Sequence, residues 1–389
     1  MNRIMRKALL VSACVLSAPA LMAQAANKTY FASRNELQQS GRAWTLGAPH
    51  KMNQTARGRF GLAVDASVFF SESDNKTGMG KHFGAASKTD LSDAAGTVEV
   101  KALDATLSNA LHGRDIDHTH DITTGDTDAA PLSGEIKLAP WQKRLGAHLH
   151  ADWDVSKAFK TLKGWHVSID APVVEVTNNL GMTVLSSTAS TTNTDDGDQK
   201  HDSGTVATFF AGTYAQTNPA DNTQAALTHG RVNAVDRKKS GFADVKLGVS
   251  YDFATERDSA VRVHGSLILP TGNKSTGVDM FEALYGNNGH VGAALGGSGS
   301  IRLWNNAARG MSLWVSGSAE YTFLFQGREK RVPGLYDNTA GTKKLWGWGH
   351  YAVGVELNKA GTFPMANKLA QDVYVTPGSH FDGVVGLTW

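Results

Sequence analysis

The chain has 389 residues, with 38 basic and 36 acidic side chains, 14 histidines, 41 glycines and one cysteine. The nearly even charge balance argues against nucleic acid as a partner. Mean hydropathy is negative, and no run of eighteen apolar residues follows the N-terminal region, which excludes a membrane-spanning helix there.

The first 25 residues have the organisation of an export signal. A positive stretch, an apolar stretch and a cleavable small-residue triplet follow one another: Arg3, Arg6 and Lys7, then residues 8–21, then residues 23–25. We predict a signal peptide at 1–25 and a periplasmic segment at 26–57. Cys14 lies in a tetrad similar to a lipobox, so a lipid anchor is the alternative, although residues 8–11 would leave a very short apolar stretch before it.

From residue 58 onward, many segments place an apolar side chain at every second position, which is typical of β-strands. The long examples are 59–72, 146–155, 164–176, 242–253, 261–270, 291–304, 311–325, 345–357 and 380–389, and the short ones are 97–103 and 133–139. A tilted strand needs about nine to eleven residues to cross a bilayer. We therefore predict an all-β fold, an antiparallel transmembrane β-barrel over 58–389.

Short and long breaks alternate between these segments. The short ones are 255–260 and 305–310, and the long ones are 178–241, 271–290 and 327–344. Bacterial outer-membrane barrels have short periplasmic turns, long extracellular loops and an even strand number. With about ten or eleven segments recognised, we predict about twelve strands, an outward-running segment at 380–389 and an absent last strand. A short strand at 372–376 is the alternative, and the terminal Trp389, an aromatic of the kind that barrel-insertion machinery reads, also argues against an absent strand.

The long break at 185–241 contains a second type of pattern. Residues 187–204 are a polar, low-complexity tract, and in 205–215 the apolar side chains recur at helical spacing. We predict a short amphipathic helix in an extracellular loop. It could fold into the lumen, lie across the barrel mouth or rest on the outer leaflet.

The polar faces of the predicted strands carry titratable side chains. The pore-lining candidates are His148, His150, Asp152, Asp154, His166, Asp170, Lys246, Arg262, His264, Arg302, Trp314 and Glu320. Histidines there could titrate near neutral pH and change conductance or bind a cation. The plain alternative is an ordinary lumen lining in which acids pair with bases on facing walls.

Four tryptophans fall on the lumenal face by strict alternation: Trp304, Trp314, Trp346 and Trp348. They could form a track for sugar rings, but aromatic girdles at the membrane interfaces are the interpretation that we favour. Trp314, well inside its segment, is the exception and is expected in the lumen. The glycines of 296–300 are expected to leave room for bulky side chains from neighbouring strands.

The segment 112–121 is dense in histidine and aspartate, and His118 and His120 are its candidate metal ligands. The favoured alternative is a solvated loop. The chain shows no motif for nucleophilic catalysis, no His-Glu-x-x-His pair and no phosphate-cradling loop. We therefore predict no enzyme activity and no cofactor.

Three stretches resemble landmarks of a group of uncharacterised Gram-negative outer-membrane β-barrels, many from intracellular bacteria. They are residues 267–304, with Pro-Thr-Gly-Asn, Phe-Glu and Gly-Asn-x-Gly-His elements, and residues 139–144 and 372–382. The chain departs from the group at Ala283, where proline is usual. The resemblance implies a porin-like or transporter-like barrel in the bacterial outer membrane and implies no substrate.

The sequence predicts an outer-membrane channel that passes or takes up small polar solutes, with selectivity set by the charged lumen. The alternative is a surface protein whose barrel anchors long loops for adhesion or host contact. The expected partners are outer-membrane lipid, small polar solutes and the insertion machinery.

Overall fold

The computed structural model describes residues 61–73, 97–101, 111–112, 133–188, 205–215, 224–256, 258–306, 308, 310–333, 335–337, 344–346, 351, 353–355 and 362–388. The predicted signal peptide at 1–25, the segment 26–57, Cys14, the metal candidates His118 and His120, Trp348 and Trp389 lie outside these ranges. Those predictions remain predictions.

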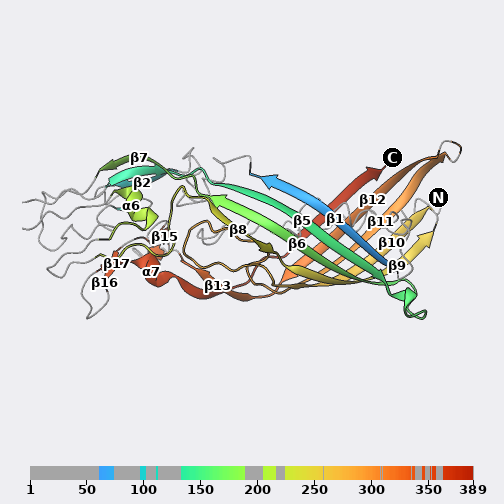
Figure 1. Cartoon of the computed structure of the whole chain (residues 1–389). Coiled ribbons are helices and arrows are strands. Elements are labelled where there is room, and N and C mark those ends of the chain that lie inside the picture. Colours follow the sequence, from blue (N-terminus) through green and yellow to red (C-terminus); the bar gives the residue numbers. More distant parts are fainter. Residues whose placement is uncertain are drawn as a thin grey trace, which may run out of the picture.

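One curled antiparallel sheet, here called the wall sheet, dominates the molecule (Figure 1). Its eight long strands lie in the order β1 (Leu62–Glu72), β5 (Trp141–Asp154), β6 (Trp165–Asn179), β9 (Val245–Glu256), β10 (Ser259–Leu269), β11 (Gly292–Asn306), β12 (Met311–Leu324) and β19 (His380–Thr388). A ninth strand, β8 (Arg237–Phe242), pairs with the C-terminal part of β6, whereas β9 pairs with its N-terminal part. The prediction of a mostly antiparallel all-β fold is confirmed.

Alternation of side chains places the two kinds of residue on opposite faces of the wall sheet. On β9, Leu247 and Val249 are 42% and 47% exposed, whereas Lys246 and Ser250 are 1% and 6% exposed. Successive residues of a strand point to opposite faces, so one face is apolar and uncovered and the other is polar and buried. We call them the outer and inner faces.

Short connections gather at one end of the wall sheet, and long ones at the other (Figure 1). The short ones are 155–164, which contains the 3-10 turn η2 (Val155–Lys157), 257–258 and 307–310; the long ones are 73–140, 180–244, 270–291 and 325–379. We call these ends the turn end and the loop end. The predicted alternation of short and long breaks is present.

The predicted direction of the segment at 380–389 is wrong. β19 is antiparallel to β12 and therefore runs toward the turn end. The predicted direction counted residues 345–357 as a wall strand. The described parts of this range pair elsewhere: β15 (Lys344–Trp346) pairs with β14 (Leu335–Asp337), and β16 (Val353–Val355) pairs with β17 (Thr362–Pro364).

The alternative strand near 372–376 exists as β18 (Gln371–Val375), but it makes no crossing of its own. It pairs with β13 (Gly327–Arg331). This short ladder continues the β12–β19 ladder toward the loop end, after an interruption in both strands. In the described residues, the path of the wall sheet thus has eight long strands in place of the predicted number of about twelve.

A second folded region lies at the loop end (Figure 1). A small sheet holds β3 (Leu111–His112), β2 (Thr97–Lys101), β4 (Ser133–Lys137) and β7 (Thr183–Thr188), with the helices α6 (Val206–Ala211) and α7 (Met365–Leu369) nearby. Residues 97–103 and 133–139 do contain strands, β2 and β4, but these belong to the small sheet. No helix in the described residues is long and apolar enough to cross a membrane.

The predicted helix in the long break is α6, and it is buried in an apolar cluster. This loop-end core comprises Ile136, Leu138, Leu180, Val206, Phe209, Phe210, Tyr214, Leu227, Val232, Met280, Phe281, Val332, Tyr351 and Ala366. Thr205 begins α6 with a capping box to Thr208, and Gly212 ends it at φ 73°. The helix therefore packs in the loop-end core.

Candidate functional site on the inner face of the wall sheet

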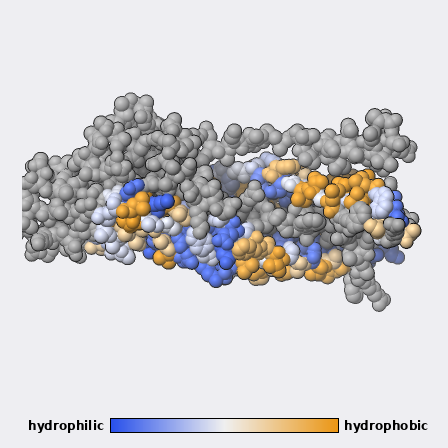
Figure 2. Space-filling model, turned by 90° about the horizontal axis from the view of Figure 1, so that it is seen from above, coloured by the Kyte–Doolittle hydropathy of each residue, from blue (hydrophilic) through white to orange (hydrophobic). Residues whose placement is uncertain are grey.

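Burial on the wall sheet is the reverse of that in a water-soluble protein. The exposed apolar residues include Leu62, Val64, Val68, Phe70, Leu149, Val167, Ile169, Leu247, Val249, Phe253, Val263, Leu295, Tyr321, Phe323, Val385 and Leu387. The buried polar residues include His148, His150, Asp152, His166, Asp170, Lys246, Arg262, His264 and Glu320. Figure 2 shows apolar surface gathered toward the turn end.

Four charged side chains from four strands form the first inner-face cluster. Arg262 donates from Nε to Asp252 over 2.6 Å and from Nη1 to Asp152 over 2.9 Å. The Nδ1 and Nε2 atoms of His166 lie 3.0 Å and 3.1 Å from oxygens of Asp152 and Asp252. An ionised carboxylate only accepts hydrogen bonds, so this arrangement suits an imidazolium that donates from both ring nitrogens.

The second cluster spans the curl of the sheet. Lys246 on β9 donates to the Glu320 carboxylate on β12, although β10 and β11 lie between these strands. His264 Nε2 lies 2.8 Å from the same oxygen of Glu320. A Cβ on Gly296 would come within 2.6 Å of His264 Nε2, so the glycine leaves the room that this contact needs, as expected for residues 296–300.

The third cluster joins two histidines to one carboxylate. His150 Nδ1 lies 2.7 Å from Asp170 Oδ1, and His148 Nε2 lies 3.9 Å from the same atom. Asp170 is the register partner of Lys246 on the neighbouring strand. The clusters are therefore adjacent, and acids are paired with bases on the inner face.

Some sequence candidates lie away from these clusters. Asp154 accepts bonds from Ser156 N and Oγ at the turn end. Arg302 pairs with Asp258, also at the turn end, and its guanidinium lies 5.5 Å from the Trp314 ring centroid.

Of the predicted tryptophan track, Trp314 is buried on the inner face. Trp304 is 42% exposed because the register shifts between Arg302 and Trp304. Trp346 belongs to β15, outside the wall sheet. The described tryptophans therefore do not share one face.

Residues 270–291 form a part of the site that sequence reasoning missed. This segment, here called the plug segment, links β10 to β11, yet it reaches distant strands of the wall sheet. Arg144 on β5 donates to Leu284 O over 3.1 Å, and Asn178 on β6 donates to Glu282 O over 2.6 Å. Ala283 is fully buried and packs in an apolar cluster with Phe69, Val174, Val176 and Ala243.

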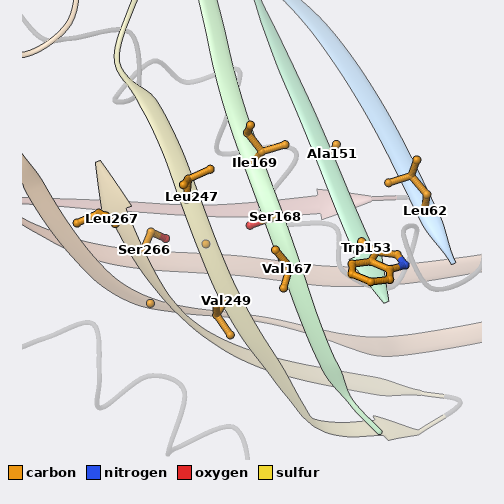
Figure 3. Close-up of a pocket in the computed structure, with 12 residues that line it drawn as sticks. Leu62, Ala151, Trp153, Val167, Ser168, Ile169, Leu247, Val249, Ser266 and Leu267 are labelled. Atoms are coloured by element: carbon orange, nitrogen blue, oxygen red, sulfur yellow. The ribbon is translucent and has the colours of Figure 1, made fainter. Parts of the chain in front are cut away.

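The outer face carries a shallow hollow of about 530 Å³ across β1, β5, β6, β9 and β10 (Figure 3). Its lining is apolar apart from two serines: Leu62, Ala151, Trp153, Val167, Ser168, Ile169, Leu247, Gly248, Val249, Gly265, Ser266 and Leu267. Figure 3 shows the larger side chains projecting from neighbouring strands. The hollow offers contact area for apolar groups and no charged group.

The described residues contain no group of three or more histidine, cysteine, aspartate or glutamate side chains placed to hold a metal ion. No protein-family model matches the chain, and no curated protein matches its sequence.

Proposed function

We propose that the wall sheet closes into a transmembrane β-barrel in the bacterial outer membrane. The observation that carries the proposal is the reversed burial: Val64, Phe70 and Phe253 are 71%, 58% and 64% exposed on the outer face, while charged groups fill the inner one. Exposed apolar side chains are unfavourable in water and favourable against lipid tails. A band of them around a polar interior is the pattern of a transmembrane barrel.

The strand directions are compatible with closure. β1 and β19 are the edges of the wall sheet, and within the described residues each pairs on one side only. Every ladder between them is antiparallel, so β1 and β19 are antiparallel to each other. Direct pairing would give eight strands, and further strands between these edges would give the predicted number of about twelve. Closure would satisfy the edge amides, which a bilayer cannot do.

Inside this barrel, we propose a narrow path for small polar solutes. The inner-face clusters give that path a charged lining, and the Lys246–Glu320 pair connects β9 to β12 across the curl. This ion pair must rearrange before a solute passes, so we expect the wild-type protein to conduct in brief steps. The charged lining would exclude apolar solutes. A wide, unselective pore does not fit an interior whose side chains are this deeply buried.

A surface anchor is the second candidate function, because the loop end has an apolar core of its own. Phe209, Phe210 and Tyr351 stack edge to face there, with ring centroids 5.1 Å to 6.5 Å apart. Such packing can hold long connections in a fixed shape for contact with another cell. In this function the inner-face pairs would only stabilise the barrel.

Single-channel recording of the refolded mature protein in a planar bilayer tests the channel. We expect discrete steps that differ between pH 5 and pH 7.5, because histidines lie on the inner face and histidine is the side chain whose ordinary charge change falls in this range. Glu320→Gln removes a charge from the Lys246 pair and should change step size or open time. Glu175→Gln, which alters an exposed pair with Lys238, is the matched control and should not. A folded, inserted but silent protein would contradict the channel and favour the anchor.

A further inference from the structure

The plug segment crosses the inner face at the loop end. It leaves β10 and returns to β11, but its middle contacts β5 and β6 through Arg144 and Asn178. Tyr285 also lies against Gly241 of β8, where an added Cβ would meet the tyrosine hydroxyl at 2.6 Å. A segment that spans these strands from the β10–β11 side lies in the way of any solute that enters from the loop end.

The plug segment is shaped mainly by its own side chains. The Glu282 carboxylate accepts hydrogen bonds from the amides of Thr276 and Val278 and from the Thr276 hydroxyl. Asn273 donates to Ala283 O over 2.9 Å and accepts from Tyr285 N over 2.7 Å. These bonds hold the segment in one loop conformation.

Many bonds and two apolar clusters fasten this unit to the rest of the protein. The bonds near its two ends involve Asp244 and His290. Asp244 accepts from the amides of Gly272 and Asn287 over 2.9 Å and 2.6 Å. At the β11 end, His290 Nδ1 lies 2.9 Å from Phe325 O, and its Nε2 lies 2.6 Å from Glu329 Oε1 on β13. A carbonyl and a carboxylate both accept only, so His290 can make both bonds only as an imidazolium.

We propose that the plug segment closes the outer mouth, and that His290 is the latch that releases its β11 end when the imidazolium loses its proton. The inference rests on the proposed channel, because a closure needs a path to close. Deprotonation removes one of the two hydrogen bonds and the charge attraction to Glu329. The bonds to Arg144, Asn178 and Asp244 remain, so the release is confined to the end of the segment next to β11.

The charges around His290 set the direction of this response. Glu329 faces the ring from β13 and is itself paired with Arg331 over 2.6 Å, Asp244 lies on the β8–β9 side, and the Lys274 side chain runs past Gly289. The hydrogen bond to Glu329 raises the pKa of His290 against the opposing effects of burial and Arg331. A raised pKa means that the latch is fully fastened below the ordinary histidine value and is lost as pH rises through the higher folded value.

Hydrogen–deuterium exchange of the full chain in lipid vesicles tests the latch without any need for conduction. The readout is the protection of the His290 and Phe325 amides, which donate to Asn287 O and Val291 O at the β11 end, corrected for the intrinsic pH dependence of exchange, between pH 6 and pH 9. We expect the wild-type protection to fall by about tenfold or more as pH rises, the size of effect expected for losing a hydrogen bond to a charged group.

Two variants and one control define the outcomes. His290→Ala should lack the protection at every pH, and Glu329→Gln should move the loss to lower pH while keeping the side-chain shape. His229→Ala, at an exposed hydroxyl contact with Thr228, should behave as wild type. Flat protection from pH 6 to pH 9, or full protection in His290→Ala, would overturn the latch. If exchange depends on pH but the protein does not conduct, the latch is supported and the channel is contradicted. If the protein conducts but protection does not change with pH, the channel is supported and the latch is contradicted.

Discussion

The wall sheet and the loop-end core place similar residues in opposite environments. Phe253 on the outer face is 64% exposed, and Phe210 in the loop-end core is fully buried. The Lys246 side chain on the inner face is 1% exposed, whereas the Lys238 side chain at the loop end is 60% exposed. One burial rule cannot explain both regions, and the difference is the one expected if, as proposed, lipid surrounds the wall sheet and water surrounds the loop-end core.

Different interactions stabilise the two regions. In the loop-end core, the hydrophobic effect in water stabilises the cluster, at roughly 25 cal/mol per Å² of apolar surface buried. On the wall sheet, the ladder hydrogen bonds and the inner-face pairs stabilise the strands, and in the proposed membrane setting the outer side chains are stabilised by contact with lipid. Four substitutions test whether the two regions differ in this way.

Phe210→Ala should have the largest effect. It removes a ring that is fully buried and packs edge to face against Phe209 and Tyr351. We expect the loop end to lose about 3–5 kcal/mol of unfolding free energy, measured by denaturant-dependent proteolysis near residues 205–215. Phe253→Ala on the outer face is the matched control and should leave that proteolysis unchanged, and an equal effect of the two would break the comparison.

Val249→Arg should have the next largest effect, and only in a membrane. Val249 lies near the middle of β9 and is 47% exposed on the outer face. An arginine at the midplane of a bilayer costs about 2–4 kcal/mol on a barrel, which guanidinium unfolding from lipid vesicles would measure. Ser240→Arg, on exposed β8, is the control. A stability loss below that of the control would argue against lipid on this face.

Gly296→Ala tests the contact that spans the curl. The new Cβ would come within 2.6 Å of His264 Nε2 and of Ala319 O. Overpacking of this kind costs about 1–3 kcal/mol, again measured by unfolding from vesicles. Gly299→Ala should be nearly neutral, because its nearest contact is an ordinary 3.4 Å. Equal stability of the two variants would mean that His264 has room elsewhere.

Thr205→Ala should have the smallest effect. Its hydroxyl accepts from Thr208 N at the start of α6, and loss of such a cap costs about 0.5–2 kcal/mol. The same proteolysis assay near residues 205–215 would detect it. Thr205→Ser retains the oxygen and should recover the wild-type result, whereas a loss equal to that of alanine would show that the hydroxyl bond is not the cause.

The sequence could predict features that depend on local periodicity. Alternation identified the long wall strands, and the helical spacing of the apolar residues from Val206 to Tyr214 identified α6. Alternation alone could not distinguish a wall strand from a short local ladder such as β14–β15 or β16–β17, so β19 was given the wrong direction. Pairing partners depend on which segments meet in space, and period two carries no information about that.

The inner-face clusters were partly predictable for the same reason. Alternation placed Asp152, Lys246 and Glu320 on the same face of the sheet. The pairing of Lys246 with Glu320 across two intervening strands depends on the curl of the sheet, which alternation does not predict. The plug segment had no periodic pattern at all. Its Asn273, Glu282 and His290 were visible as motif residues, and only the fold shows that they bond to the loop itself and to β13.

Spin labels on two adjacent residues of β9 would show whether lipid covers the outer face. Single cysteines at Val249 and Ser250 differ only in the face of β9 on which they lie, with 47% and 6% exposure. In vesicles, we predict that the label at 249 collides with oxygen dissolved in the lipid and not with a water-soluble nickel complex, and that the label at 250 is protected from oxygen. Equal oxygen accessibility at both positions, or nickel access at 249, would contradict the membrane assignment.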